Sequence, residues 1–227
     1  MILVCHQAEH LSYLGIIYKI LQSDVFVILD TSGFRKNYFD ARNIIRTKED
    51  KQWVTIPVHA SMNQPLNTVR IDYSHKWQSS YLQSIKQNYS KAKYFNEIYP
   101  EIERIILKQA SSLAELNIEL LMFILSKFNY KGKVLLGSNL NLNQHLSATD
   151  MLIDVCKKIG ADTYLSGIGG RNYLEEEKFK ENNLELQYQN FVHPVYEQVY
   201  KQKFIQNLSS IDFLMNNKLD KLTMNVV

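Results

Sequence analysis

The first thirty residues constrain the fold of this chain more than any other stretch. The apolar run Met1–Val4 predicts a buried strand that ends in Cys5-His6-Gln7. Apolar residues at helical spacing predict an amphipathic helix over Leu11–Gln22, and a second apolar strand, Val25–Leu29, ends on Asp30. A strand, a loop, a helix and a strand in this order are the usual opening of a doubly wound α/β domain.

Three polar residues stand at the carboxyl ends of these two strands, where sheets of this kind bind their ligands. His6 and Gln7 follow the first strand and Asp30 follows the second, and we expect His6 and Asp30 to carry the chemistry. Successive side chains of a strand point to opposite faces, which separates Cys5 from His6 and argues against a cysteine–histidine pair. Cys5 is therefore expected to be a small core residue.

The rest of the chain continues this alternation of strands and helices. Further strands are expected at Gln52–Val58, Lys133–Gly137, Asp162–Ser166 and Gln187–Val192. Helices are expected at Trp77–Tyr89, Glu101–Phe128 with a break near 110–112, Asp150–Ile159 and Ser209–Asn216. We interpret 31–47 as a loop and 92–99 as a connection that ends before Pro100.

This pattern predicts an α/β fold with a doubly wound, mainly parallel sheet of about five strands and helices on both faces. There is no repeat, linker or low-complexity segment in the sequence. Residues 1–227 are therefore expected to form a single domain with a mainly helical elaboration around 74–130.

Composition narrows the function classes. A net charge of +3 spread over 227 residues argues against the dense basic face that coats nucleic acid. Cys5 and Cys156 both stand in apolar surroundings, which indicates a reducing, cytoplasmic setting, and the first strand begins at Met1 without room for a signal peptide. No apolar run reaches the roughly 20 residues of a membrane span, so membrane insertion is not expected.

Two polar segments after strands are candidate ligand sites. Arginine forks suit phosphate or carboxylate oxygens, and the loop 31–47 offers the candidates Lys36, Asn37, Arg42 and Asn43 among aromatic residues. Glycine after a strand allows close approach of a ligand to the backbone, and Asp162–Ser166 is followed by the candidates Gly167, Gly169, Gly170, Arg171 and Tyr173. A solvated basic loop and a plain tight turn are the alternatives.

Several familiar sites are excluded by their missing patterns. The chain has no G-x-x-x-x-G-K-[ST] phosphate loop, no G-x-G-x-x-G dinucleotide turn and no G-x-S-x-G elbow. Its six histidines lack the spacing with cysteine or glutamate that zinc sites use, and no metal is expected. The stretch His6-Gln7-Ala8-Glu9-His10 loosely resembles the phosphate-binding histidine loop of the nucleotidyltransferase superfamily, which implies a HUP-like opening unit and ATP as a possible cofactor.

Several motifs in order resemble the WbqC-like family over nearly the full length. The resemblance is carried by Gln7, Leu11, Leu14, Gly15 and Asp24–Asp30, by Phe34, Lys36-Asn37, Arg42-Asn43, Ile45 and Trp53–Val58, by Trp77, Ile85, Tyr89 and Phe95, and by Asp162–Leu174, His193-Pro194-Val195-Tyr196, Gln198, Leu208-Ser209, Asp212 and Asn216. It implies a role in the biosynthesis of bacterial O-antigen and other surface polysaccharides, including lipopolysaccharide. It also adds His193, Tyr196 and Gln198 to the candidate substrate-binding residues.

The chain departs from the family pattern at a few positions. Relatives carry proline, tyrosine, proline and tryptophan where this chain has Ala8, His10, Ser12 and Tyr13. A histidine that usually follows the tryptophan motif is Tyr81 here. The resemblance therefore supports His6 and Gln7 as family site residues and gives no such support to His10.

From these observations we expect an enzyme that binds a nucleotide-linked amino sugar and attaches an aminoacyl or acyl group, such as glycine, to its amine. His6 is expected to act as the general base, because an imidazole titrates near neutral pH, and Asp30 to orient it. An ATP-activated acid, a charged tRNA and an acyl thioester all remain open as the acyl donor. A sugar-nucleotide-binding protein without catalysis and a glycosyltransferase are the alternatives.

Overall fold

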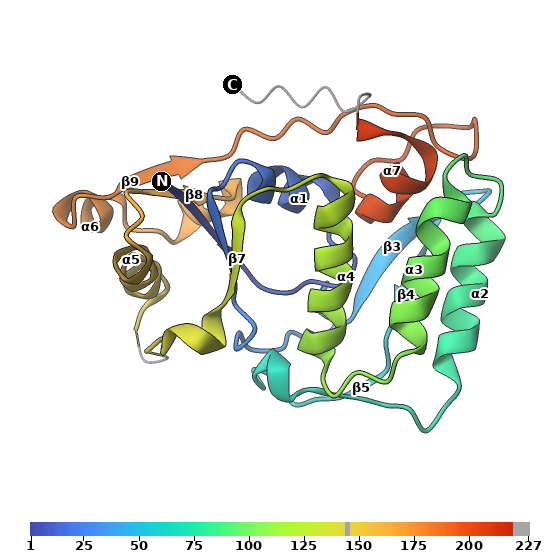
Figure 1. Ribbon diagram of the computed structural model, residues 1–227, viewed down its shortest axis with the longest axis horizontal. Helices are drawn as coiled ribbons and strands as arrows, with labels where there is room; N and C mark the ends of the chain where they lie inside the picture. Colours follow the sequence, from blue (N-terminus) through green and yellow to red (C-terminus); the bar gives the residue numbers. More distant parts are fainter. Residues whose placement is uncertain (144–145, 220–227) are drawn as a thin grey trace. The chain divides into compact units, whose positions relative to one another are not determined.

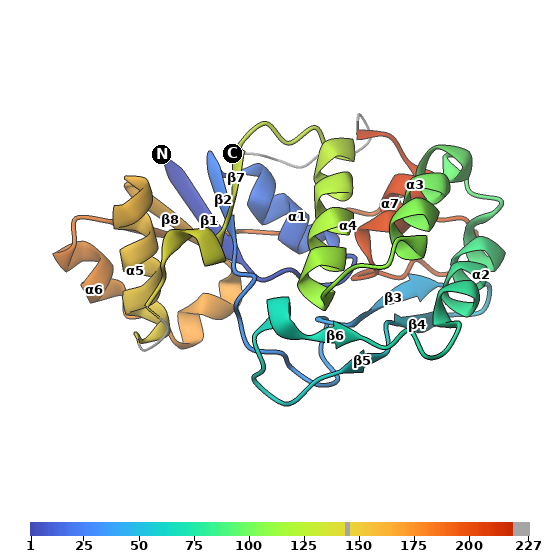
Figure 2. The same cartoon turned by 60° about the horizontal axis from the view of Figure 1, so that its bottom comes forward.

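The computed structural model describes residues 1–143 and 146–219, and Figure 1 and Figure 2 draw it as a ribbon. The chain divides into two compact units, each built from three segments. Unit 1 comprises Met1–Gln7, Gly15–Thr31 and Tyr130–Val192, and unit 2 comprises Ala8–Leu14, Ser32–Asn129 and His193–Val227. The expected single domain with a helical elaboration around 74–130 stays a prediction.

The regular elements alternate in unit 1 and are mostly helical in unit 2. Unit 1 holds β1 (Ile2–His6), α1 (Leu14–Leu21), β2 (Val25–Ile28), β7 (Lys133–Leu136), η2 (Gly137–Leu140), α5 (Ala148–Ile159), β8 (Thr163–Ser166), η3 (Ile168–Asn172), α6 (Glu176–Glu181) and β9 (Glu185–Tyr188), although Leu14 itself belongs to unit 2. Unit 2 holds β3 (Arg42–Arg46), β4 (Lys51–Thr55), β5 (Val58–His59), η1 (Leu66–Thr68), β6 (Arg70–Ile71), α2 (Trp77–Tyr89), α3 (Phe95–Leu107), α4 (Leu113–Lys127) and α7 (Ser210–Asn216).

A five-stranded parallel sheet forms the centre of unit 1, as the sequence predicts. Its strand order is β7-β2-β1-β8-β9, and every neighbouring pair runs parallel. Numbered along the chain, this order is 3-2-1-4-5, the order of a doubly wound sheet. Residues of α5 pack on the face that carries Leu3 and Cys5, and α1 covers the opposite face. The predicted α/β class is confirmed, while the likeness of the opening unit to nucleotidyltransferases stays a prediction.

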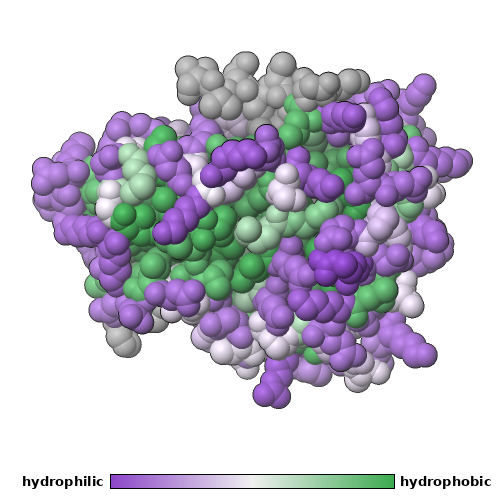
Figure 3. Space-filling model, viewed as in Figure 1, coloured by the Kyte–Doolittle hydropathy of each residue, from purple (hydrophilic) through white to green (hydrophobic). Residues whose placement is uncertain are grey.

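The edge strand β7 leaves a hydrophobic surface on unit 1. Leu135, Leu140 and Leu142 are only partly buried where they pack against the core of the sheet. Figure 3 shows hydrophobic residues gathered over β7 on this face. An apolar edge of this kind follows from the near-continuous apolar strands that a two-sided parallel sheet requires.

The third strand that the sequence predicts is not part of the parallel sheet. Residues 52–55 belong to β4, which pairs antiparallel with β3 in unit 2, with Ile44 opposite Trp53, and Val58 belongs to β5, which pairs with β6. The sequence of β3 does not show the alternation of apolar and polar residues that predicts a strand, because Arg42, Asn43 and Arg46 surround its two isoleucines. The sequence therefore predicts a loop at this position. The fifth strand of the sheet is instead β9, close to the segment expected at Gln187–Val192.

Two helices begin at other residues than the sequence predicts. α1 begins at Leu14 rather than Leu11, because Leu11 is left-handed with φ of 45° and cannot continue a right-handed helix. α3 begins at Phe95, within the expected connection, and contains Pro100. A proline inside a helix costs about 3 kcal/mol, and α3 offsets this cost by burying six apolar or aromatic side chains on one face.

Other boundaries follow local chemistry and agree with the sequence. α2 occupies the expected Trp77–Tyr89, and the expected break separates α3 from α4, where Ser112 caps the new helix by accepting from the Glu115 N–H. α5 is capped by Ser147 and ends at Gly160, whose φ of 74° favours glycine.

A buried carboxylate ties the last described helix to the rest of unit 2. Asp212 on α7 is completely buried and accepts hydrogen bonds from the hydroxyls of Tyr89 and Tyr196, both 2.9 Å, and from Gln198 Nε2 at 2.9 Å. Burial raises the pKa of Asp212 even though these donors act in the opposite direction. The network joins α2, α7 and the segment that contains Tyr196.

Replacing Asp212 should therefore destabilise the protein strongly. Asp212→Ala leaves three buried donors without an acceptor, and we expect a loss of about 3 kcal/mol or more in the free energy of unfolding. Tyr196→Phe removes a single donor and should cost only about 1 kcal/mol. Urea unfolding of both variants measures the difference, and equal losses would show that Asp212 does not organise this network.

Candidate functional site

The strands β1 and β8 separate toward their carboxyl ends. They pair at Ile2↔Thr163 and Leu3↔Tyr164 only, whereas β1 stays paired with β2 as far as His6 and β8 with β9 as far as Ser166. The chain order of the strands also reverses between β1 and β8, which is where doubly wound sheets bind ligands. The candidates His6, Gln7 and Gly167 lie at these two strand ends, so the fold brings them to one edge of unit 1.

His6 is half-buried at the end of β1, and a charged residue of α1 lies close to its imidazole. The imidazole Nδ1 lies 3.4 Å from Lys19 Nζ, and the same ammonium lies 3.4 Å from the main-chain oxygen of Cys5. Lys19 is only 5% exposed. Sequence reasoning missed it, although a lysine in the otherwise apolar stretch Leu14–Leu21 was a usable signal.

Cys5 lies on the opposite face, as the strand geometry predicts. Its side chain belongs to the core that α5 covers, together with Cys156. Burial raises the pKa of the Cys5 thiol far above its ordinary value, so the thiol stays protonated at neutral pH.

Asp30 lies just beyond β2 and accepts a hydrogen bond from the backbone of unit 1. Its carboxylate is buried, and Oδ1 accepts a hydrogen bond of 2.9 Å from the Ser138 N–H at the start of η2. This contact joins the carboxyl ends of β2 and β7. The expected pairing of Asp30 with His6 stays a prediction.

The glycine-rich turn after β8 is a 3₁₀ turn with a close backbone approach. A Cβ on Gly170 would lie 2.1 Å from Ser166 Oγ and would force the Ser166 side chain to shift, whereas Gly169 faces open space. Arg171 is exposed, and its guanidinium carbon lies 4.1 Å from the centre of the Tyr188 ring on β9. Tyr173 is also exposed. The turn thus presents a guanidinium held in place at the edge of the sheet.

The basic-loop candidates belong to unit 2. Lys36 and Asn37 are exposed, and the Arg42 guanidinium donates to the main-chain oxygen of Asn37. Arg42 also stacks over Trp53 at 4.1 Å, across the β3–β4 hairpin. These contacts hold Arg42 in place, and its expected role in holding a diphosphate stays a prediction.

Asn43 makes its described hydrogen bonds within unit 2, and its expected contact with a substrate stays a prediction. It is 1% exposed, and its Nδ2 donates to the main-chain oxygens of His10 at 2.8 Å and Leu11 at 2.9 Å. Its Oδ1 accepts from the Ile44 N–H at 2.7 Å. The amide has no hydrogen left for a ligand, so we assign Asn43 to the support of the loop that contains left-handed Leu11.

The remaining three candidates, on the segment after residue 192, also bond within unit 2. His193 bonds to the Pro194 oxygen and accepts from the Asn207 N–H at 3.1 Å, and burial lowers its pKa. Tyr196 and Gln198 donate to Asp212, and Gln198 also accepts from the Ile205 N–H. Their described contacts hold this segment in place.

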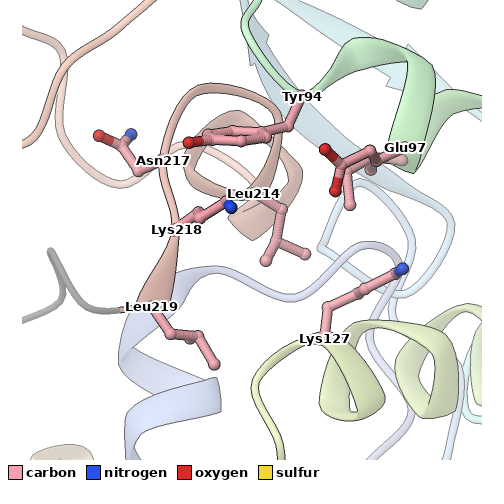
Figure 4. A pocket seen from close by; sticks show the side chains of 8 residues that line it. Tyr94, Glu97, Lys127, Leu214, Asn217, Lys218 and Leu219 are labelled. Carbon is pink, nitrogen blue, oxygen red and sulfur yellow. The ribbon is translucent and has the colours of Figure 1, made fainter.

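Two cavities are lined by described residues of unit 2. The larger, of about 750 Å³, is lined by Phe39, Phe204 and Arg46, whose guanidinium donates to the main-chain oxygens of Asp50 and Lys203. Figure 4 shows the smaller, of about 360 Å³, where Tyr94 and Leu214 form apolar walls. None of the predicted site residues lines either cavity.

Metal ligands and membrane helices are not found in the described structure. Within residues 1–143 and 146–219, no three His, Cys, Asp or Glu side chains lie together as the ligands of a metal ion would. No helix of these residues is long and apolar enough to cross a membrane.

Comparison with known proteins assigns the family. The chain matches the WbqC-like protein family over residues 7–224. It belongs to this family. It is also similar to a protein of Mycobacterium tuberculosis (strain ATCC 25618 / H37Rv) titled "Uncharacterized protein Rv1507c", with 28% identity over 183 residues that cover 79% of this chain and 78% of that protein. No solved structure matches the chain significantly.

Two departures of this WbqC-like protein from the expected family pattern contact each other. His10 is fully buried, and its Nε2 lies 2.7 Å from the Tyr81 hydroxyl. The tyrosine and histidine that the resemblance places at positions 10 and 81 are thus both present, with their positions exchanged. The other ring nitrogen, Nδ1, lies 3.0 Å from Asn117 Oδ1, while Asn117 Nδ2 donates to the oxygens of Ala8 and Asp40. Sequence reasoning missed Asn117, a polar residue at an apolar position of α4.

His10 should make the stability of the protein sensitive to acid. Burial lowers its pKa from 6.5 to about 4, and the hydrogen bond that His10 donates to Asn117 Oδ1 offsets only part of this effect. Between pH 4 and pH 6.5, His10 binds a proton in the unfolded chain and does not bind it in the folded chain. His10 therefore contributes its full stabilisation above pH 6.5, and the free energy of unfolding should fall by roughly 3 kcal/mol as the pH is lowered to 4.

Chemical unfolding at a series of pH values measures this contribution. His10→Gln should remove most of this slope, and His59→Gln, which replaces an exposed histidine of unit 2, should retain it. A His10→Gln protein with the same slope as the wild type would show that His10 is not the group responsible.

Proposed function

We propose that this WbqC-like protein is an enzyme that attaches an aminoacyl or acyl group to the amine of a nucleotide-linked amino sugar. The observation that carries the proposal is the separation of β1 and β8, with His6 on one strand end and the glycine-rich turn on the other. Bacterial surface-polysaccharide biosynthesis, with which the family is associated, supplies the pathway.

The same edge offers groups for the phosphates of such a substrate. Arg171 presents a guanidinium that Tyr188 holds in position, and guanidinium forks bind phosphate oxygens through two parallel hydrogen bonds. Gly170 lets the turn lie close to the end of β8. In this proposal the diphosphate lies between the turn and His6, and the amino sugar extends from it.

The reaction forms one bond and breaks another. The amine nitrogen attacks the carbonyl carbon of the acyl donor and releases a proton to solvent, and the leaving group departs with the bonding electrons. An ATP-activated acid, a charged tRNA and an acyl thioester differ only in this leaving group. Cys5 is not the nucleophile of this reaction, because it is buried on the other face with a raised pKa.

The direct test is product formation from defined substrates. The protein is incubated with a panel of nucleotide-linked amino sugars, glycine and ATP, and the products are followed by mass spectrometry. We expect the mass of one sugar nucleotide to rise by one glycyl group, with consumption of ATP. Tight binding of a sugar nucleotide without turnover, across all three donor classes, would instead support a binding protein without catalysis.

Variants of two neighbouring residues on β1 locate the chemistry. His6→Asn should reduce turnover at low sugar-nucleotide concentration by on the order of 10-fold or more, because losing one hydrogen bond to a charged phosphate costs about 1.5–3 kcal/mol. Cys5→Ala is the matched control: it changes the adjacent residue on the other face and should leave turnover near normal. A folded His6→Asn protein with normal turnover would exclude His6, and loss of turnover in folded Cys5→Ala would indicate a thioester intermediate.

A further inference from the structure

Lys19 occupies a costly position that the proposed function does not by itself explain. It is 5% exposed on α1, between Ile17 and Ile20, which are completely buried. A buried ammonium loses much hydration energy and is retained only where hydrogen bonds replace the lost water. The described contacts of Lys19 Nζ are with the Cys5 oxygen and with His6 Nδ1, each at 3.4 Å.

Hydrogen-bond chemistry assigns the direction of these contacts. A main-chain oxygen only accepts and an ammonium only donates, so Lys19 donates to Cys5 and has further hydrogens for His6. Nδ1 of His6 must then be the acceptor, which places the ring proton on Nε2. A doubly protonated ring would also put a second positive charge 3.4 Å from the ammonium, so this arrangement favours the neutral ring.

We propose that Lys19 is a positioning residue that holds His6 as the Nε2–H tautomer, so that His6 donates a hydrogen bond to an anionic phosphate oxygen of the ligand. The proposal rests on the ligand site of the proposed function, and it changes the role of His6 from the general base expected from the sequence to a donor. A donor at the end of β1 complements Arg171 at the end of the neighbouring strand. Both then stabilise negative charge at the same edge of the sheet.

The tautomer is measured directly on the ligand-free protein. Long-range ¹H–¹⁵N NMR spectra distinguish the protonated from the unprotonated ring nitrogen, and His6→Asn identifies the His6 signals among the six histidines of the chain. We expect the Nε2–H pattern in the wild type and in Lys19→Gln, which keeps a donor. Lys19→Met lacks a donor and should show a mixture of tautomers. Lys133→Met, which removes an exposed lysine of β7, should match the wild type.

The anion is tested with inorganic pyrophosphate, the phosphate part shared by nucleotide-linked sugars. Pyrophosphate should shift the His6 Nε2–H signals, and calorimetry should show affinity at least 10-fold weaker for His6→Asn. His6→Gln should stay within a few-fold of the wild type, because a glutamine amide reaches about as far as Nε2. Unchanged His6 signals at millimolar pyrophosphate would overturn the donor role.

The two proposals fail in different ways. An Nδ1–H or fully protonated His6 in the wild type, or an Nε2–H pattern that survives in Lys19→Met, would overturn the role of Lys19 even if the acylated sugar is formed. Absence of product with all donors would overturn the proposed function, while the tautomer and the pyrophosphate affinity would still decide the inference.

Discussion

The hydrogen bonding of one short loop constrains much of unit 2. The segment Ala8–Leu14 is buried, so its main-chain oxygens need donors within the protein. Asn117 on α4 donates a hydrogen bond to the main-chain oxygen of Ala8, and Asn43 on β3 donates to the main-chain oxygens of His10 and Leu11. A single loop thus ties a hairpin to a helix far away in the sequence. Because these contacts hold Leu11 in a left-handed conformation, they also decide where α1 begins.

The polar groups at the carboxyl edge of the parallel sheet in unit 1 have two kinds of role, one in the fold and one in the proposed chemistry. Asp30 bonds to the backbone of η2 and closes the ends of β2 and β7. His6 instead contacts a buried lysine on the face that α1 covers. Among the neighbouring strands of this sheet, only β1 and β8 lose their pairing toward their carboxyl ends. The proposed chemistry is therefore assigned to the one place where neighbouring strands separate.

Polar residues that look like ligand contacts in a sequence are often the internal donors of the fold. Asn43, Tyr196 and Gln198 stand among aromatic or basic neighbours, and all three bond to buried acceptors in unit 2. Lys19 shows the opposite case, since it stands in an apolar helix and lies beside the candidate reactive histidine. Sequence patterns record polarity and period, but they do not show which acceptor a buried donor meets.

The sequence alone determined four of the five parallel strands and, approximately, the fifth strand β9. It also determined the order of strand and helix in unit 1, the two faces of β1 and the polar residues at the strand ends. These features depend on local periodicity and on the two-residue alternation of a strand, which the chain carries wherever it is read. The tertiary structure decided that residues 52–55 pair with β3 outside the sheet, that α3 continues through Pro100, and that Lys19 and Asn117 meet the partners described above. Each of these depends on a partner far away in the sequence, and its energy comes from burial and hydrogen bonds that exist only when the chain is folded.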